Sequence, residues 1–325
     1  MRQILAPIIA FFAFCGAAQS ADKVNLRLDW FHSSYHAPFF LGIDKGIYAE
    51  ANIDLSVLEG RGSVQTIQLV GKGDDQFGFV AVDSIMRAVG AGIPVVSIET
   101  LMPIMGQAIF VLSNSGIMRL EDLKGRTVAV TPGGTNEALL PAVLASAGLK
   151  DSDLKKVTID ASAKVRMFLN RDVDAMIATA WAHSLFESGG GARAFVYSDY
   201  GTKMVGYSIV TNTDLTNTNP DLVRRFVAAT ANAWMLAKAS PEAALDALAT
   251  HSRPNAAPAR RKGNSVDFAK ASAFIAPAEE GKPYGYQSEK DWKDTQTTLL
   301  KYGVIKKELP VSAYMINTFA PSNSH

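Results

Sequence analysis

The sequence of 325 residues contains a single cysteine, Cys15. One thiol excludes a disulfide framework and a thiolate metal cluster within the chain. An excess of charge of either sign is also missing, because 32 Lys and Arg face 31 Asp and Glu. This balance gives no electrostatic signature of binding to nucleic acid or to an anionic membrane surface. The 48% hydrophobic and 19% charged residues are typical of a folded protein and exclude a disordered, collagen-like or coiled-coil chain.

A long hydrophobic run occurs only at the N-terminus. Arg2 precedes an apolar stretch over 4–18, which small residues follow, and this pattern predicts a secretory signal peptide over 1–20. The run is shorter than the roughly 20 apolar residues of a membrane-spanning helix. We therefore expect an exported, periplasmic chain, without a lipid anchor at Cys15, because Phe14 stands before it where a small residue is needed. Removal of Arg2 leaves 31 basic and 31 acidic residues, which is a neutral chain.

Beyond the signal peptide, short β-type runs alternate with helical patterns, which indicates an α/β fold with open sheets. The length suits two units, at roughly 150 residues per domain. Apolar runs predict strands at 24–30, 53–57, 77–82, 95–98, 108–112, 127–130, 157–159, 174–179 and 205–210. Helix starts with an N1 proline follow at Asn219 and Ser240, and a further helix is predicted over 288–302. We expect the Pro-, Ala- and Arg-rich stretch 251–264 to be a solvated loop.

The two units are expected to be lobes that the chain visits in turn. We expect 21–107 to begin lobe 1, 108–206 to form lobe 2, and 207–325 to return to lobe 1 and add the C-terminal helices. Apolar crossover strands around 105–111 and 205–210 would join the lobes beneath a cleft. Because ligands of open α/β sheets bind beyond the carboxyl ends of the strands, the candidate residues lie in the strand-end loops.

The loop after the first strand, 29–36, carries two aromatic residues and two histidines. A flat ligand could stack on Trp30 or Tyr35, and His36 could supply a directional hydrogen bond. The alternatives are that Trp30 is a buried aromatic residue and that His36 caps the following helix. His32 and His36 are four residues apart, but we expect no metal, because the segment is a loop, no cysteine is available and the nearest acid belongs to the strand.

Three further candidates belong to lobe 1. Gly60 and Arg61 precede Ser63, which is expected to cap a helix and could also contact an acceptor or anion on the ligand. Asp83 follows the third strand and is expected to be an N-cap whose carboxylate could also point into the cleft. Tyr207 lies on the returning crossover, where it could reach the ligand.

Lobe 2 offers a glycine-rich strand-to-helix loop and a tryptophan. The loop contains Gly134, Thr135 and Glu137, but it lacks the lysine of a phosphate-binding loop and the spacing of a dinucleotide-binding fingerprint. Glu137 could accept an amine or a ring N–H, although an acid in a first helical turn is also favoured by the helix dipole alone. Trp181 follows the last strand of this lobe and is expected to face Trp30 across the cleft; the alternative is that both are separate buried aromatics.

Catalytic motifs are missing from the sequence. It contains no Gly-x-Ser-x-Gly elbow, no His-Glu-x-x-His helix and no cysteine nucleophile after residue 15. We therefore expect binding without catalysis and without a cofactor.

Three segments, 28–79, 120–137 and 284–306, resemble the periplasmic solute-binding proteins of ABC importers that group with binders of thiamine pyrimidine precursors, sulfonates, taurine and nitrate (SsuA/THI5-like). The resemblance implies a type II periplasmic-binding-protein fold, a small-molecule solute, a permease as partner and a monomer. Asp-Trp followed after five residues by His, and then Ala-Pro-Phe-Phe, resembles the pyrimidine-precursor branch, with formylaminopyrimidine or hydroxymethylpyrimidine as the implied ligand type. The ligand contacts that this implies are Trp30, His36, Ser63, Gly134, Thr135 and Glu137. His32 and Ser33 depart from the Pro-Asn that the branch usually has.

Two alternatives stay open at this point. A binder of a sulfonate, taurine, nitrate or an aromatic carboxylate would use Arg61, Ser63 and Thr135 to hold the anion. The same branch includes intracellular enzymes that make the pyrimidine from pyridoxal phosphate and histidine. Those enzymes carry a cysteine-rich motif, which this sequence lacks.

Overall fold

The structure is a computed structural model that describes residues 20–130, 135–159 and 161–321. The predicted signal peptide, with Cys15, lies outside these residues except for Ser20. Within the described part, no helix is long and apolar enough to cross a membrane.

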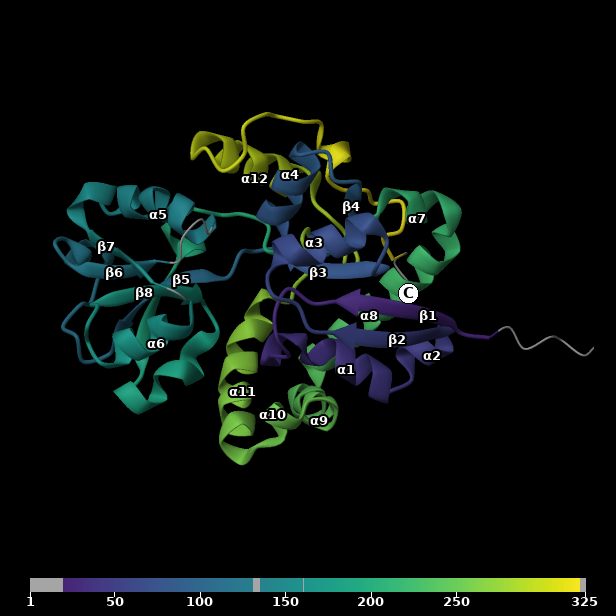
Figure 1. Cartoon of the computed structure of the whole chain (residues 1–325), viewed down its shortest axis with the longest axis horizontal. Coiled ribbons are helices and arrows are strands. Elements are labelled where there is room, and N and C mark those ends of the chain that lie inside the picture. The colour runs from purple at the N-terminus through teal and green to yellow at the C-terminus, as the bar shows by residue number, and fades with distance from the viewer. Residues whose placement is uncertain (1–19, 131–134, 160, 322–325) are drawn as a thin grey trace, which may run out of the picture.

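In the described part of the chain, ten strands form two five-stranded sheets, which lie toward opposite ends of the long axis of the molecule (Figure 1). The first sheet has the order β2-β1-β3-β10-β4, in which β10 runs antiparallel to both of its neighbours. Its strands are β1 (Asp22–Arg27), β2 (Ile53–Leu58), β3 (Phe77–Ala81), β4 (Val95–Met102) and β10 (Tyr207–Asn212). The helices that connect them are α1 (Ala37–Asp44), α2 (Ile47–Glu50), α3 (Ser63–Lys72) and α4 (Val82–Gly90).

The second sheet has the order β7-β6-β8-β5-β9. Its strands are β5 (Gln107–Leu112), β6 (Thr127–Val130), β7 (Lys155–Thr158), β8 (Ala175–Thr179) and β9 (Ala192–Val196). Helices α5 (Thr135–Ser146) and α6 (Ala161–Leu169) and the 3-10 segment η4 (Ala182–Gly189) connect them. The α/β class predicted from the sequence is therefore confirmed, and β9 is a strand that the sequence did not predict.

Side chains alternate between two cores on either face of the first sheet. On β3, Phe77 and Phe79 face the core formed with α1 and the C-terminal helices, whereas Val80 faces the core formed with α3 and α4. Phe77 stacks on Phe226 with ring centroids 3.8 Å apart and planes 8° apart. This alternation is the period of two that a strand buried on both faces requires.

The chain after β10 is helical. The helices are α7 (Thr213–Thr218), α8 (Pro220–Ala239), α9 (Pro241–His251), α10 (Arg253–Ala256), α11 (Pro258–Ala271) and α12 (Glu289–Lys301). The prediction of a solvated loop over 251–264 was wrong, because α10 and α11 occupy it. Pro254 and Pro258 lie in the first turns of these helices, where a missing N–H leaves no hydrogen bond unmade. Arg261 joins α11 to α9 through Glu242 (2.9 Å) and Asp246 (2.7 Å).

The two sheets are joined by short segments that run side by side. The Met105 N–H donates to the Met204 carbonyl (2.7 Å), and the Gly206 N–H donates to the Met102 carbonyl (3.0 Å). A Cβ atom at Gly206 would lie 2.6 Å from the Ile104 carbonyl oxygen, so only glycine fits this close approach. The expected lobe limits at 107/108 and 206/207 remain a prediction.

Candidate functional site

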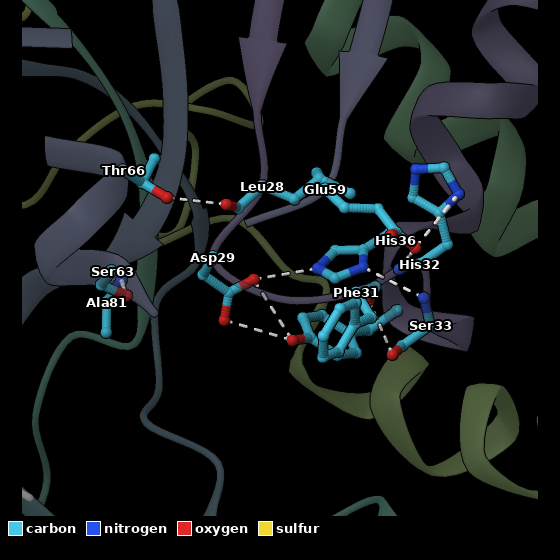
Figure 2. A network of polar contacts seen from close by, with 11 residues as sticks. Leu28, Asp29, Phe31, His32, Ser33, His36, Glu59, Ser63, Thr66 and Ala81 are labelled. Carbon is cyan, nitrogen blue, oxygen red and sulfur yellow. Dashed lines mark hydrogen bonds and ion pairs between the residues drawn. The ribbon is translucent and has the colours of Figure 1, made fainter. Parts of the chain in front are cut away.

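A buried carboxylate organises the loop after β1. Figure 2 shows the Asp29 side chain pointing toward the imidazole of His36, whose Nε2 lies 2.9 Å from Asp29 Oδ1. The Tyr35 hydroxyl donates to both Asp29 oxygens, at 3.2 and 3.1 Å. Burial, and then the charge of Asp29, raises the pKa of Tyr35 well above its ordinary value, so that the hydroxyl keeps its proton and remains a donor. The Asp29 carboxylate is therefore held by two side chains of its own loop, Tyr35 and His36.

The hydrogen bonds of His36 define its tautomer. The Ser33 backbone N–H donates to His36 Nδ1 (3.2 Å), so Nδ1 carries the lone pair and Nε2 carries the proton that points at Asp29. His36 is completely buried. Because both ring nitrogens are used within the loop, His36 acts in this structure by orienting Asp29, and its predicted direct contact with a ligand remains a prediction.

Aromatic rings from both lobes meet beside this carboxylate. Trp181, which follows β8, lies 5.2 Å from the Tyr35 ring and 6.2 Å from the Tyr207 ring, measured between centroids. A Cβ atom at Gly106 would lie 2.3 Å from the indole of Trp181, so glycine is needed for this packing. Tyr35, Trp181 and Tyr207 are thus brought together in the structure, and their contact with a ligand remains a prediction.

The expectation that Trp30 faces Trp181 across the cleft remains a prediction, but the alternative that both are buried does not hold for Trp30. The Trp30 ring is 44% exposed and makes an edge contact with Phe31, whereas Trp181 is buried. The exposure of Trp30 has a cause in the backbone. The N–H groups of Gly60 and Gly62 donate to the carbonyls of Trp30 (3.1 Å) and Asp29 (2.6 Å). These bonds hold the Asp29 side chain inward and leave the indole of Trp30 at the surface.

Ser63 and Asp83 are close to this site but do not cap helices. The N-cap of α3 is Gly62, and the Ser63 hydroxyl instead accepts a hydrogen bond from the Ala81 N–H (3.1 Å) at the end of β3. Ser63 therefore ties two strand-end loops together (Figure 2). Asp83 lies in the first turn of α4, where Arg87 Nη2 donates to its carboxylate (3.0 Å).

Two carboxylates lie near Tyr207, and one of them, Asp83, is paired with Arg87. After burial, the charges of Asp29 and of Asp83 both raise the pKa of Tyr207. The Tyr207 hydroxyl thus lies within the field of two carboxylates, both of them buried. Asp29 was not predicted as a site residue, because the sequence placed it in the strand.

The lobe 2 candidates are only partly described. Gly134 lies outside the described residues, and Thr135 begins α5 with a side chain that is not described. The Glu137 carboxylate lies 4.0 Å from Lys156 Nζ on β7, so the contact seen for it is an ion pair. The roles of these three residues in ligand binding remain predictions.

Lys164 on α6 is a residue that the sequence did not indicate. Its Nζ donates to the Ile177 carbonyl (2.6 Å) on β8, and burial lowers its pKa to about 8. Lys164 lies inside a helix, where a lysine gives no signal that distinguishes it from a solvated residue.

Among the described residues, no group of three His, Cys, Asp or Glu side chains could hold a metal ion. The two histidines of the loop have different partners. His32 Nδ1 lies 3.7 Å from Glu59, and burial lowers the pKa of His32, whereas His36 Nε2 lies 2.9 Å from Asp29.

Comparison with known proteins places this geometry in context. Residues 33–244 match the profile of the family described as NMT1/THI5 like. The 4-amino-5-hydroxymethyl-2-methylpyrimidine phosphate synthase of Legionella pneumophila is 30% identical over 138 residues, which are 42% of this chain and 43% of that protein. A putative binding protein of Brucella abortus is 23% identical over 255 residues, 75% of this chain and 76% of the relative. The chain thus covers less than half of the Legionella protein.

Solved structures of periplasmic proteins share the fold. The periplasmic aliphatic sulphonate binding protein SsuA from Escherichia coli superposes with a TM-score of 0.73 at 18% identity, over 94% of this chain and 96% of that one. At this identity the likeness concerns the fold alone. The family match covers well over half of the chain. The chain therefore belongs to the NMT1/THI5-like family and has the fold of the periplasmic binding proteins.

Proposed function

We propose that the chain is the exported receptor of an ABC importer, which captures a small heteroaromatic solute between its lobes and delivers it to a permease. The observation that carries the proposal is the Asp29 carboxylate, held by His36 and Tyr35 beside the rings of Trp181 and Tyr207. The ligand type we propose is a thiamine pyrimidine precursor, formylaminopyrimidine or hydroxymethylpyrimidine. The likeness to the periplasmic sulphonate binding protein SsuA supports a periplasmic receptor, and the likeness to the Legionella pyrimidine phosphate synthase supports a pyrimidine.

The acceptor character of the site supports a ligand that donates hydrogen bonds. Asp29 keeps lone pairs that an amino group or ring N–H could use, and a carboxylate accepts such bonds strongly. The aromatic cluster suits a flat ring. A buried carboxylate that is already oriented would contribute both affinity and selectivity for an aminopyrimidine.

The same electrostatics disfavour an anionic ligand. A sulfonate or carboxylate would approach Asp29, and two like charges 4 Å apart repel by about 4 kcal/mol at an effective dielectric constant of 20. Asp83 adds less repulsion, because Arg87 is paired with it at 3.0 Å. Arg61, the cation expected to bind an anion, is exposed at the surface, and its backbone N–H donates to Gln65 Oε1. Sulfonates, taurine, nitrate and aromatic carboxylates therefore form the comparison set of the test.

A thermal-shift panel on the exported form tests the proposal. We expect hydroxymethylpyrimidine or formylaminopyrimidine to raise the melting temperature, because a ligand that binds only the folded state stabilises it. Asp29→Asn should reduce the shift at a given ligand concentration, because a site about tenfold weaker stabilises the folded state less. Asp54→Asn, which changes an exposed acid on β2, is the matched control. Stabilisation by taurine or nitrate, without stabilisation by either pyrimidine, would contradict the proposal.

A pyrimidine synthase is the second candidate, because the Legionella relative carries that name. The chain offers Lys164, whose pKa is lowered to about 8, but no cysteine after residue 15, so the residues present do not fit the cysteine-rich motif of such enzymes. A visible absorbance band on incubation with pyridoxal phosphate, lost in Lys164→Met, would favour the synthase over the receptor.

A further inference from the structure

Helix α11 lies between the two lobes and makes a polar contact with lobe 2 (Figure 1). Asp267 accepts two hydrogen bonds from Ser184, one from the backbone N–H (2.8 Å) and one from the hydroxyl (2.6 Å). Ser184 belongs to η4, which connects β8 and β9 of the second sheet and begins directly after Trp181. The contact therefore lies three residues from the aromatic ring that lobe 2 places in the site.

The other side of α11 is attached to lobe 1. Arg261 binds two acids of α9, which itself packs against α1. Asn264 Nδ2 donates to Asn255 Oδ1 (2.8 Å), and Asn255 Nδ2 donates to the His32 carbonyl (3.1 Å) in the loop that carries Asp29. Helix α11 thus connects the site loop of lobe 1 with the site segment of lobe 2.

The contact with Ser184 is close and partly withdrawn from solvent. A Cβ atom at Gly263, one turn before Asp267, would lie 3.0 Å from Ser184 Cβ, which is tighter than ordinary packing. Burial has the largest effect on Asp267 and raises its pKa. The hydrogen bonds from Ser184 and the charge of Arg260 act in the opposite direction, and the charge of Glu187 adds to the increase. Hydrogen bonds to a carboxylate in such surroundings are among the stronger ones in proteins.

We propose that Asp267 and Ser184 are positioning residues that form a latch between the lobes and set the balance of open and closed forms. The inference rests on the proposed receptor function, because a latch on the closed form gives Trp181 its place against Tyr35 and Tyr207. Loss of a hydrogen bond to a charged group lowers an equilibrium constant by about tenfold or more. We expect Asp267→Ala and Ser184→Ala each to shift the closed-to-open ratio by at least that factor.

The distance between the lobes, measured without ligand, tests the latch. Cys15→Ser removes the single native thiol of the chain. Two introduced cysteines, S56C on β2 and K124C in lobe 2, then carry the two spin labels. We expect one short distance in the otherwise unchanged protein and a longer one in Asp267→Ala and Ser184→Ala. Ser265→Ala is the matched control, because its hydroxyl is on the same helix and approaches Glu242 of α9 instead.

A second variant separates the latch from folding. Gly263→Ala should open the lobes by pressing against Ser184, yet it should not lower the melting temperature, because alanine favours a helix by about 1 kcal/mol over glycine. Unchanged distances in Asp267→Ala, Ser184→Ala and Gly263→Ala, or an equal shift in Ser265→Ala, would overturn the latch. A long distance in the parent protein would also overturn it. The distance measurement uses no ligand, so it can contradict the latch while the ligand panel supports the receptor function. The opposite pair of results is equally distinguishable.

Discussion

Glu99 on β4 offers a sharp test of the structure through the pH dependence of stability. Its side chain is completely buried, and neither carboxylate oxygen has a hydrogen-bond partner among the described residues. Burial raises the pKa of Glu99 well above its ordinary value. The folded chain therefore keeps a proton on this group at a pH at which the unfolded chain has released it.

The sign of the effect follows from this difference in protonation. An exposed glutamate in the unfolded chain has a pKa of about 4.3. Between that pH and the raised pKa of the folded state, the folded chain binds one proton more, so the free energy of unfolding falls as pH rises. The slope from one such group reaches about 1.4 kcal/mol per pH unit. Below the unfolded pKa the group is neutral in both states and contributes no slope.

Thermal unfolding of Glu99→Gln and of the wild type between pH 4 and 8 measures this contribution. We expect similar melting temperatures at the acid end and a growing advantage of the glutamine variant as pH rises, at about 2 °C per kcal/mol for a protein of this size. Glu121→Gln is the control, because the side chain of Glu121 is 49% exposed. A difference between wild type and Glu99→Gln that is constant with pH, or one that changes in the wild type's favour, would refute the reasoning.

Three substitutions test other parts of the structure, all by urea unfolding. Arg27→Ala should destabilise the chain by about 3 kcal/mol, because it leaves the buried carboxylate of Asp75, now bound at 2.8 Å, without its partner; a loss below 1 kcal/mol would contradict this. Gly206→Ala should cost about 1 to 3 kcal/mol, because its Cβ would collide with backbone carbonyls of the crossover; an unchanged midpoint would show that this junction can move. Tyr35→Phe should cost about 1.5 to 3 kcal/mol through the lost bond to Asp29, and a neutral result would place the hydroxyl elsewhere.

Local patterns explain why most of the fold could be predicted. The strands of the first sheet follow alternating or continuous apolar runs, and Asn219 caps α8 by accepting a hydrogen bond from the Leu222 N–H (3.2 Å). Strand β9 lies at the edge of its sheet, and its sequence, Ala-Arg-Ala-Phe-Val, has no clear alternation of apolar and polar residues. The sequence therefore gives only a weak indication of a strand. Helix α11 is polar, and its ion pairs with α9 are tertiary contacts that no local pattern indicates.

The candidate site could be predicted by residue type but not by orientation. Tyr35 and Trp181 were proposed from strand-end loops and Tyr207 from the returning crossover, and the structure brings the three rings together. The outward position of Trp30 and the inward position of Asp29 depend on backbone hydrogen bonds from the Gly60–Gly62 turn, which follows a different strand. Side-chain direction in such a loop is decided by partners distant in sequence, so residue type alone could not assign Asp29 its place.

The central claim, that an oriented carboxylate captures a neutral heteroaromatic solute, is tested most directly by calorimetric titration of the exported protein with hydroxymethylpyrimidine and, separately, with taurine. We predict a pyrimidine affinity near micromolar, about −8 kcal/mol, and no heat from taurine. Asp29→Asn should weaken the pyrimidine by about tenfold or more, since hydrogen bonds to a charged acceptor contribute about 1.5 to 3 kcal/mol. Binding of taurine without pyrimidine, or pyrimidine binding that Asp29→Asn leaves unchanged, would contradict the account.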